Sequence, residues 1–376
     1  MKVYLDNAAT TPIAPEIIEM INKMMKVNFA NPSSLHSFGR ESKIIIESAR
    51  KKISELLGTS PGSIFFTSGG TEADNMAIKC GIHDHKITHA ITSSISHHAV
   101  LYPLQDLHHE GVIKLSYIDI DKDGVVSLSH LKELLKDNPR TFVSIMHANN
   151  EIGTIQDLKK IGEICKEHNA IFHSDTVQTI GHFPFNMQEL NVDFMAASAH
   201  KFHGPKGVGF MYISENIKIK PLIRGGGQER NMRAGTENIY GIAALAMAME
   251  IAYKNLEEEM EYIKQLKKYM IEQLKAKIPD VQFYGKCEDM DNSLYTVLSC
   301  NFPETDISEM LLFNLDILGV ACSGGSACAS GGSKGSHVLA EICPDSKRPG
   351  IRFSFSKYNR KEEIDFAVAQ LSKLFL

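Results

Sequence analysis

Long apolar runs, blocks of basic residues and closely spaced cysteines are all scarce in this sequence. No apolar run reaches the roughly 18 residues that a membrane-spanning helix needs, and the N-terminus turns polar too early for a signal peptide. The net charge is −5 and no stretch gathers Lys and Arg, so neither nucleic acid nor a membrane surface is an expected partner. We expect a cytoplasmic protein that acts on small molecules.

The seven cysteines are scattered from Cys80 to Cys343 and do not form the dense framework of a small secreted domain. We therefore expect most of them to be reduced. With 376 residues the chain exceeds the usual limit for one hydrophobic core, so two domains, or a large domain with a smaller lobe, are expected.

Short apolar runs that end in polar or glycine residues alternate with helical patterns from about residue 41 to residue 214, which is typical of a doubly wound α/β sheet. The runs lie at 63–67, 89–92, 142–146, 170–174 and 194–197. Ligands of open α/β sheets bind outside the carboxyl ends of the strands, so the residues after these five runs should meet in one crevice.

The pattern beyond this region is helical from 240 to about 278, which predicts a long connecting helix. A smaller α+β part follows, with strands expected around 293–301 and 350–354 and a C-terminal helix near 361–374. A glycine-dense loop at about 322–335 contains Cys328.

Lys201 stands at the end of a buried strand with glycine and proline just beyond it, which suits a Schiff base with pyridoxal phosphate (PLP). Asp175, delivered by the neighbouring strand, could keep the cofactor's ring nitrogen protonated. Taken singly, each has an ordinary explanation, a strand-end lysine or a helix-capping carboxylate. Together they favour a PLP site.

A phosphate group needs backbone N–H donors and hydroxyls at a helix N-terminus. Gly70 and Thr71 lie where a helix begins after an apolar run, and Ser198 and His200 could complete the phosphate cup. The nucleotide-binding pattern G-x-x-x-x-G-K-[ST] is missing, so a nucleotide loop is not supported.

His97 and His98 follow a strand, and one of their rings could stack on the cofactor and serve as acid or base, although a solvated pair is also common. Arg352 lies between apolar neighbours on an expected strand. Its guanidinium could bind a substrate carboxylate in a bidentate way or form a structural ion pair, and the sequence does not choose between them.

Cys328 lies in a stretch with too little apolar surface to bury a thiol, so it is a candidate nucleophile. A metal site shared with Cys322 and Cys343 is the alternative, but spacings of 6 (328 − 322) and 15 (343 − 328) match no common zinc pattern. We expect no resident metal, although Cys328 could act as an iron–sulfur ligand during transfer.

The chain closely resembles the cysteine desulfurases of the nitrogen-fixation and iron–sulfur-cluster type, within the class V aminotransferase group. The resemblance runs nearly end to end through the segments 4–12, 147–153, 175–178, 198–207, 225–230 and 326–328. It implies the type I fold of PLP-dependent transferases, with a large domain at 13–256 built on a mainly parallel seven-stranded sheet. The smaller α+β domain would comprise 1–12 and 257–376.

The resemblance also implies roles for single residues. It makes Lys201 the lysine that binds the PLP aldehyde, Asp175 the partner of the ring nitrogen, Gln178 a donor to the ring hydroxyl and His97 the stacking histidine. Contacts with cofactor or substrate are implied for Asn7, Asn150 and Arg352, and the phosphate would be held by Gly70, Thr71, Ser198 and His200. Thr236 would reach the phosphate of the neighbouring subunit, which implies a homodimer.

The implied activity converts L-cysteine to L-alanine and leaves the sulfur on Cys328 as a persulfide. An iron–sulfur scaffold or a thiolation enzyme would then accept it. The chain has Ser333-Lys334-Gly335 where the family usually has Leu-Glu-Pro, so the acceptor stays open. Alternatives are a selenocysteine lyase or another class V PLP enzyme, and a catalytically silent binding protein.

Overall fold

The computed structural model describes residues 1–136, 138, 140–306, 308–324 and 335–375. Its largest feature is a seven-stranded sheet in the order β2-β8-β7-β6-β5-β3-β4. The strands are β2 (Ile64–Thr67), β3 (His89–Ser93), β4 (Lys114–Ile118), β5 (Thr141–Ser144), β6 (Ile171–Asp175), β7 (Phe194–Ser198) and β8 (Gly209–Ile213). Strand β8 is antiparallel to both neighbours and the other pairs are parallel, so the predicted mainly parallel sheet is confirmed.

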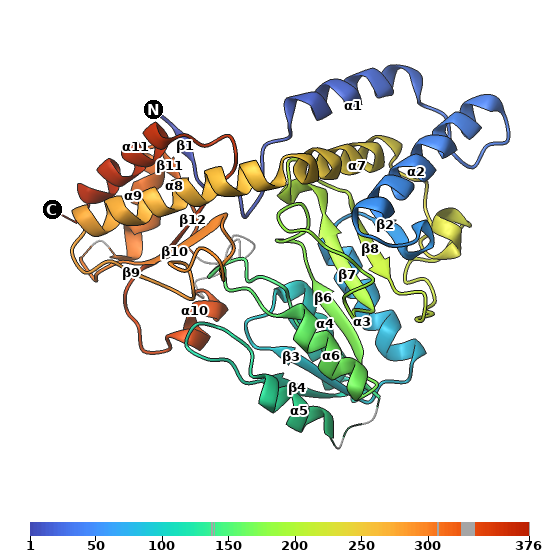
Figure 1. The fold of residues 1–376 in the computed structure, drawn as a ribbon, viewed down its shortest axis with the longest axis horizontal. Coiled ribbons are helices and arrows are strands. Elements are labelled where there is room, and N and C mark those ends of the chain that lie inside the picture. Colours follow the sequence, from blue (N-terminus) through green and yellow to red (C-terminus); the bar gives the residue numbers. More distant parts are fainter. Residues whose placement is uncertain (137, 139, 307, 325–334, 376) are drawn as a thin grey trace.

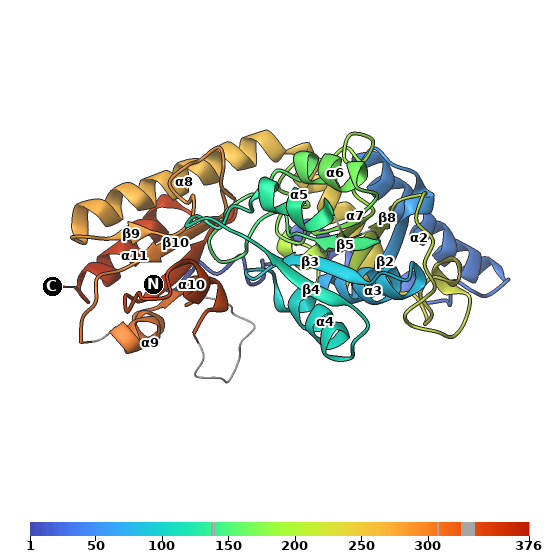
Figure 2. The same cartoon turned by 90° about the horizontal axis from the view of Figure 1, so that it is seen from below.

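Both faces of this sheet are covered by helices. Successive residues of a strand point to opposite faces, so one strand can contribute to a core on each side. On β2, Ile64 and Phe66 belong to one hydrophobic core and Phe65 belongs to the other. Figure 2 shows the helices that cover the two faces: α3 (Gly70–Asp84) and α4 (His98–His109) on one side, α5 (Leu128–Lys136), α6 (Leu158–Glu167) and α7 (Ile239–Lys254) on the other. Helices α1 (Pro15–Val27) and α2 (Ser37–Leu56) pack on α7.

A second, smaller body surrounds an antiparallel sheet in the order β12-β10-β9. Its strands are β9 (Gln282–Phe283), β10 (Val297–Asn301) and β12 (Gly350–Ser354), and β1 (Val3–Tyr4) pairs in parallel with β11 (Val320–Ala321). Helices α8 (Leu256–Lys277), α9 (Leu311–Ile317), α10 (His337–Ile342) and α11 (Lys361–Ser372) belong here. Both chain termini lie beside this sheet (Figure 1). The domain boundaries at 12/13 and 256/257 stay a prediction.

The single long helix predicted over 240–278 is wrong in one respect, because α7 and α8 meet at a break. Asn255 leaves helical geometry there, with φ of −112° and ψ of 15°. Asparagine is a poor helix former, and Glu257, Glu258 and Glu259 suit the positive end of a new helix. Within the described ranges, no helix is long and apolar enough to cross a membrane.

Candidate active site

A cavity of about 150 Å³ lies at the carboxyl end of the large sheet. It is lined by residues that follow all five of the apolar runs found in the sequence: Gly70 and Thr71 after β2, His97 after β3, Asn150 after β5, Asp175 and Gln178 at β6, and Ser198, His200 and Lys201 at β7. Ala8, Ala9 and Arg352 come from the N-terminal segment and β12. One cavity thus holds most of the predicted site residues.

The start of α3 forms one wall of the cavity and suits an anion. Gly69, which precedes the helix, has φ of 153° and ψ of −175°, a combination nearly restricted to glycine. A Cβ on Gly70 would lie 2.4 Å from Cγ2 of Val177, so the helix start packs directly on the segment after β6. The Ser198 hydroxyl oxygen lies beside the start of this helix, 3.5 Å from the position that a Cβ added to Gly69 would occupy. The first N–H groups of a helix attract negative charge.

Lys201 ends a short 3₁₀ helix, Ala199–Lys201, that continues β7. Its amine donates hydrogen bonds to the carbonyl oxygens of Ala8 at 2.5 Å and Ala9 at 3.0 Å. Its own carbonyl oxygen lies 3.0 Å from Nε2 of His182, which anchors the backbone. The lysine is therefore held at the cavity from both ends.

Asp175 is the last residue of β6 and is only 7% exposed. Its Oδ1 accepts a hydrogen bond from the backbone N–H of Val177 at 2.9 Å. Burial raises the pKa of this carboxyl, while His97, the Val177 N–H and Lys201 counteract the rise. A cationic group brought next to Asp175 would stabilise its charged form.

His97 caps the N-terminus of α4, where its Nδ1 accepts a hydrogen bond from the backbone N–H of Ala99 at 3.1 Å. In this arrangement a neutral ring carries its proton on Nε2. The ring of His98 instead stacks on Tyr102 with centroids 4.6 Å apart, outside the cavity lining. The structure therefore brings His97, and not His98, to the cavity.

His200 also lines the cavity, and its Nδ1 lies 3.2 Å from the Thr10 hydroxyl. Burial lowers the pKa of its ring to about 4, with smaller contributions from Lys201 and Lys206. A neutral imidazole at this position can donate or accept a hydrogen bond without adding charge.

Arg352 is buried and forms the structural ion pair that was one of the two arrangements left open by the sequence, while its role in substrate binding stays a prediction. Its guanidinium donates to Asp6 Oδ1 at 2.9 Å and to the carbonyl oxygen of Asn150 at 2.8 Å. It also lines the cavity, and its buried Nε has no hydrogen-bond partner among the described residues. Gln178 also lines the cavity and donates to the carbonyl oxygen of Ala8 at 3.0 Å.

Three predicted residues are not part of this lining. The side-chain amide of Asn7 donates to the Ser354 carbonyl oxygen and to Oδ1 of Asn359. Thr236 lines a different cavity of about 180 Å³, between β2 and the segment 225–238. Cys328 lies outside the described residues. The roles assigned to these three stay predictions.

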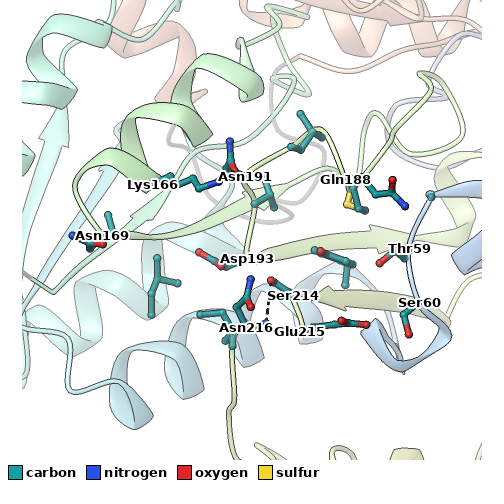
Figure 3. Close-up of a pocket in the computed structure, with 18 residues that line it drawn as sticks. Thr59, Ser60, Lys166, Asn169, Gln188, Asn191, Asp193, Ser214, Glu215 and Asn216 are labelled. Atoms are coloured by element: carbon teal, nitrogen blue, oxygen red, sulfur yellow. Dashed lines mark hydrogen bonds between the residues drawn. The ribbon is translucent and has the colours of Figure 1, made fainter.

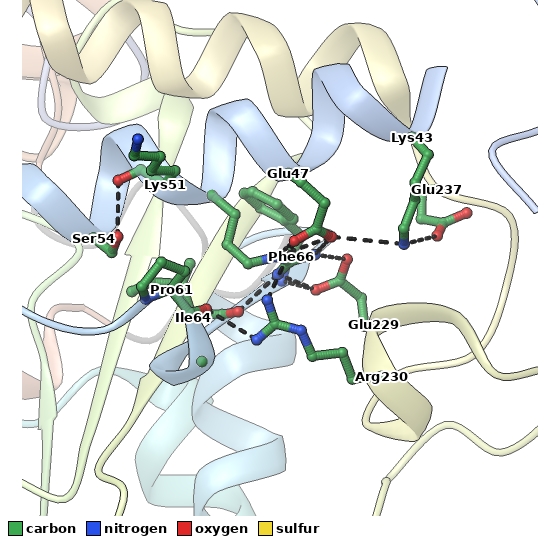
Figure 4. A network of polar contacts seen from close by, with 12 residues as sticks. Lys43, Glu47, Lys51, Ser54, Pro61, Ile64, Phe66, Glu229, Arg230 and Glu237 are labelled. Atoms are coloured by element: carbon green, nitrogen blue, oxygen red, sulfur yellow. Dashed lines mark hydrogen bonds and ion pairs between the residues drawn. The ribbon is translucent and has the colours of Figure 1, made fainter. Parts of the chain in front are cut away.

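The segment that carries Thr236 is anchored by a buried ion pair. Glu229 accepts from both terminal nitrogens of Arg50 at 2.8 Å and from the backbone N–H of Phe66 at 2.8 Å. Figure 4 shows Glu229 reaching toward Phe66 and Ile64, with Arg230 beside it. The contact fixes the segment against α2 and the edge strand β2.

One carboxylate of the lining was missed in the sequence. Asp74 lies one turn into α3, on the same helical face as Gly70, and is 1% exposed. It stands among the apolar residues Ala73, Met76 and Ala77. A charged residue type inside a buried helical face is the signal that could have revealed it.

A larger cavity of about 710 Å³ lies at the other edge of the sheet, beside the amino ends of β6 and β7 (Figure 3). Its lining is rich in amide and hydroxyl groups, and it contains none of the predicted site residues. Its most enclosed carboxylate, Asp193, accepts the backbone N–H of Phe172 at 2.9 Å, which is a structural contact. Ligands of such sheets bind at the carboxyl edge, so the smaller cavity is the candidate active site.

Comparison with known proteins agrees with this geometry. The sequence pattern of the family described as "Aminotransferase class-V" matches residues 3–366. The chain is 43% identical to a cysteine desulfurase IscS of Dictyoglomus turgidum, with 99% of this chain and 94% of the relative covered. For a cysteine desulfurase IscS of Clostridium botulinum the identity is 44% at the same coverage.

Solved structures give the same result. A NifS-like protein superposes with a TM-score of 0.91 at 37% identity, covering 100% of this chain and 99% of that one. A structure described as SspA in complex with cysteine has a TM-score of 0.82 at 31% identity, covering 96% of this chain and 100% of that one.

Proposed function

Because the chain belongs to the class V aminotransferase family and to its cysteine desulfurases, we propose that it takes sulfur from L-cysteine, releases L-alanine and keeps the sulfur on Cys328 as a persulfide. The observation that carries the proposal is the single cavity that unites Lys201, Asp175 and the start of α3. A relative of the same fold is described in complex with cysteine, which supports this substrate.

The residues of the cavity fit pyridoxal phosphate. The start of α3 and the Ser198 hydroxyl offer donors for its phosphate, and the buried Asp175 offers a carboxylate for its ring nitrogen. Lys201 lines the same cavity and offers the amine for its aldehyde. When bound there, the cofactor would withdraw electrons from the α-carbon of the substrate.

Residues of the chain would bind the substrate and move its proton. Arg352, with its unused buried Nε, would bind the substrate carboxylate beside Asn150. Lys201 and His97 are the groups at the cavity that could move the proton of the α-carbon.

The sulfur transfer needs one nucleophilic thiol, which Cys328 would provide. The Cys328 thiolate would attack the substrate sulfur, so that a sulfur–sulfur bond forms and the bond between sulfur and the β-carbon breaks. The electron pair of the broken bond, together with a proton, would leave in L-alanine. The persulfide would then pass to an acceptor protein, either an iron–sulfur scaffold or a thiolation enzyme. The acceptor and the cytoplasmic location stay predictions.

A homodimer is part of the proposal. Large apolar side chains are exposed along α1, the loop after it and the first half of α2, a patch that a second copy would cover: Ile18, Met25, Val27, Phe29, Leu35, Phe38 and Ile44. Leu35 is 91% exposed. Helix α1 lies at the rim of the molecule in Figure 1, accessible to a partner. Such a dimer would allow Thr236 to serve the site of the partner.

The decisive experiment supplies L-cysteine and a thiol reductant to the PLP-loaded protein. We expect alanine and sulfide in equal amounts, and Cys328→Ala should abolish both. Cys343→Ala, which removes a partly exposed cysteine elsewhere in the chain, should leave both rates unchanged. Wild-type protein without sulfide release, or undiminished release by Cys328→Ala, would refute the proposal.

A further inference from the structure

Asp74 and His173 form a buried pair beside the cavity that the proposed function does not use. Oδ1 of Asp74 lies 3.2 Å from Nε2 of His173, and their side chains are 2% and 0% exposed. Among the described residues, neither of these two atoms has a hydrogen-bond partner. Such burial of polar atoms is costly unless a further group engages them.

The fold sets this pair next to Asp175. His173 and Asp175 are two residues apart on β6 and therefore point to the same face of the sheet. That face is covered by α3, which contacts β6 and carries Asp74. Asp74 lines the same cavity as Asp175, so two buried carboxyl groups lie at the end of the cavity assigned to the ring nitrogen.

The carboxyl groups of Asp175 and Asp74 have different neighbours. Asp175 is near His97 and Lys201 and accepts the N–H of Val177. Asp74 faces His173 and Asp175. Burial and the charge of Asp175 raise the pKa of Asp74 well above its ordinary value.

The burial of the histidine beside Asp74 disfavours the charged form of its ring. Burial lowers the pKa of His173 to about 3, and its Nδ1 lies 2.8 Å from the Ser144 hydroxyl. When that hydroxyl donates to Nδ1, the proton of the ring is on Nε2 and faces Asp74. In that case His173 presents an N–H group to Asp74 without supplying a positive charge.

Resting on the proposed function, we propose that Asp74 is a positioning residue: a protonated, neutral carboxyl group, oriented by His173, that leaves Asp175 as the sole negative charge at the cofactor's ring nitrogen. Two charged carboxylates in this enclosure would repel each other. A neutral Asp74 fills the space beside Asp175, excludes water from it and has a proton to donate toward the ring end of the cavity.

Substitution by asparagine and by alanine separates the charge of Asp74 from its shape. Asp74→Asn keeps a neutral group of the same size, so the absorbance of the bound cofactor should keep the pH profile of the wild type. Asp74→Ala should weaken PLP binding to the stripped chain by about tenfold, the factor that 1.4 kcal/mol represents. Asn75→Ala is the matched control, because Asn75 lies on the same helix and donates to Thr71 instead of lining the cavity.

Infrared difference spectroscopy of the holoenzyme tests the protonation directly. The carbonyl band of a protonated carboxyl group should be present in wild type near neutral pH, absent in Asp74→Asn and retained in Asp175→Asn. The proposal is overturned if Asp74→Asn shifts the cofactor spectrum as Asp175→Asn does, or if the band survives in Asp74→Asn. It is also overturned if Asp74→Ala binds PLP like the wild type.

These readouts do not depend on turnover. A wild type that binds PLP but forms no alanine from cysteine would refute the proposed function and leave the Asp74 test readable. If Asp74→Ala fails to fold, Asp74→Asn and His173→Gln still test whether Asp74 is protonated and in contact with His173. His173→Gln should preserve the carboxyl band and alter its frequency.

Discussion

The Lys201 amine donates a hydrogen bond of 2.5 Å to the carbonyl oxygen of Ala8, a residue 193 positions earlier in the chain. A second bond of 3.0 Å goes to Ala9. The N-terminal segment thus forms a wall of the cavity and positions its central lysine. Both acceptors are backbone carbonyl groups, so the position of the amine depends on the path of the N-terminal segment.

Lys201→Ala should remove the covalent attachment of PLP and the absorbance band that accompanies it. Loss of the amine as proton carrier should also lower the turnover of cysteine by about 10²–10⁴-fold. Lys206→Ala, an exposed lysine five residues further on, is the control and should retain both band and rate. Absorbance before and after borohydride reduction measures the linkage, and an unchanged band in Lys201→Ala would contradict the assignment.

Much of the site could be predicted because parallel strands end at the same edge of a sheet. Asp175 and Lys201 each follow a short apolar run, and this pattern alone predicts that they meet. The type of residue at each strand end then indicates the chemistry. Neither step requires knowledge of how distant helices pack.

The parts that were missed depend on such packing. Asp74 lies inside a helix, where the sequence does not say which strand the carboxyl group faces. The bonds from Lys201 end on backbone carbonyls, which every residue has and no sequence pattern marks. The break at Asn255 is a local choice between continuing a helix and starting a new one, and the helical pattern is the same for both.

The buried ion pair between Arg50 and Glu229 should contribute strongly to stability. Arg50→Met leaves the Glu229 carboxylate buried without its partner, and we expect a loss of about 3–5 kcal/mol in the free energy of unfolding. Lys52 lies on the same helix as Arg50 and forms an exposed pair with Glu250 of α7, so Lys52→Met should cost much less stability than Arg50→Met. Urea denaturation measures both, and equal losses would contradict this reading of the pair.

His203 should make stability depend on pH. The ring is 8% exposed, its Nδ1 lies 2.9 Å from the Pro12 carbonyl, and burial lowers its pKa to about 4. An unfolded histidine titrates near pH 6.5, so between pH 6.5 and about 4 the unfolded chain binds more protons than the folded one. The stability associated with His203 is therefore fully present above pH 6.5 and is lost as the pH falls to about 4.

The comparison of wild type with His203→Gln isolates this contribution. The difference between their unfolding free energies should shrink by about 2–3 kcal/mol from pH 7 to pH 4. The exposed His109→Gln should follow the wild-type profile at every pH. Parallel profiles for wild type and His203→Gln would show that the ring is not held neutral in the fold.

The apolar patch on α1, the loop after it and α2 should hold the proposed dimer together. Phe29→Asp places a charge where Phe29 stacks on Phe38, with ring centroids 6.0 Å apart. If this patch is the interface, dissociation should become easier by about 30-fold or more, the factor that 2 kcal/mol represents. Phe313→Asp on α9 replaces a phenylalanine that is 56% exposed but lies outside the patch, and it should leave the dimer intact. Sedimentation velocity over a range of protein concentrations distinguishes the two variants.

If Phe29→Asp remains as dimeric as Phe313→Asp, the interface does not include this patch. The argument that Thr236 serves the site of the partner would then lose its support.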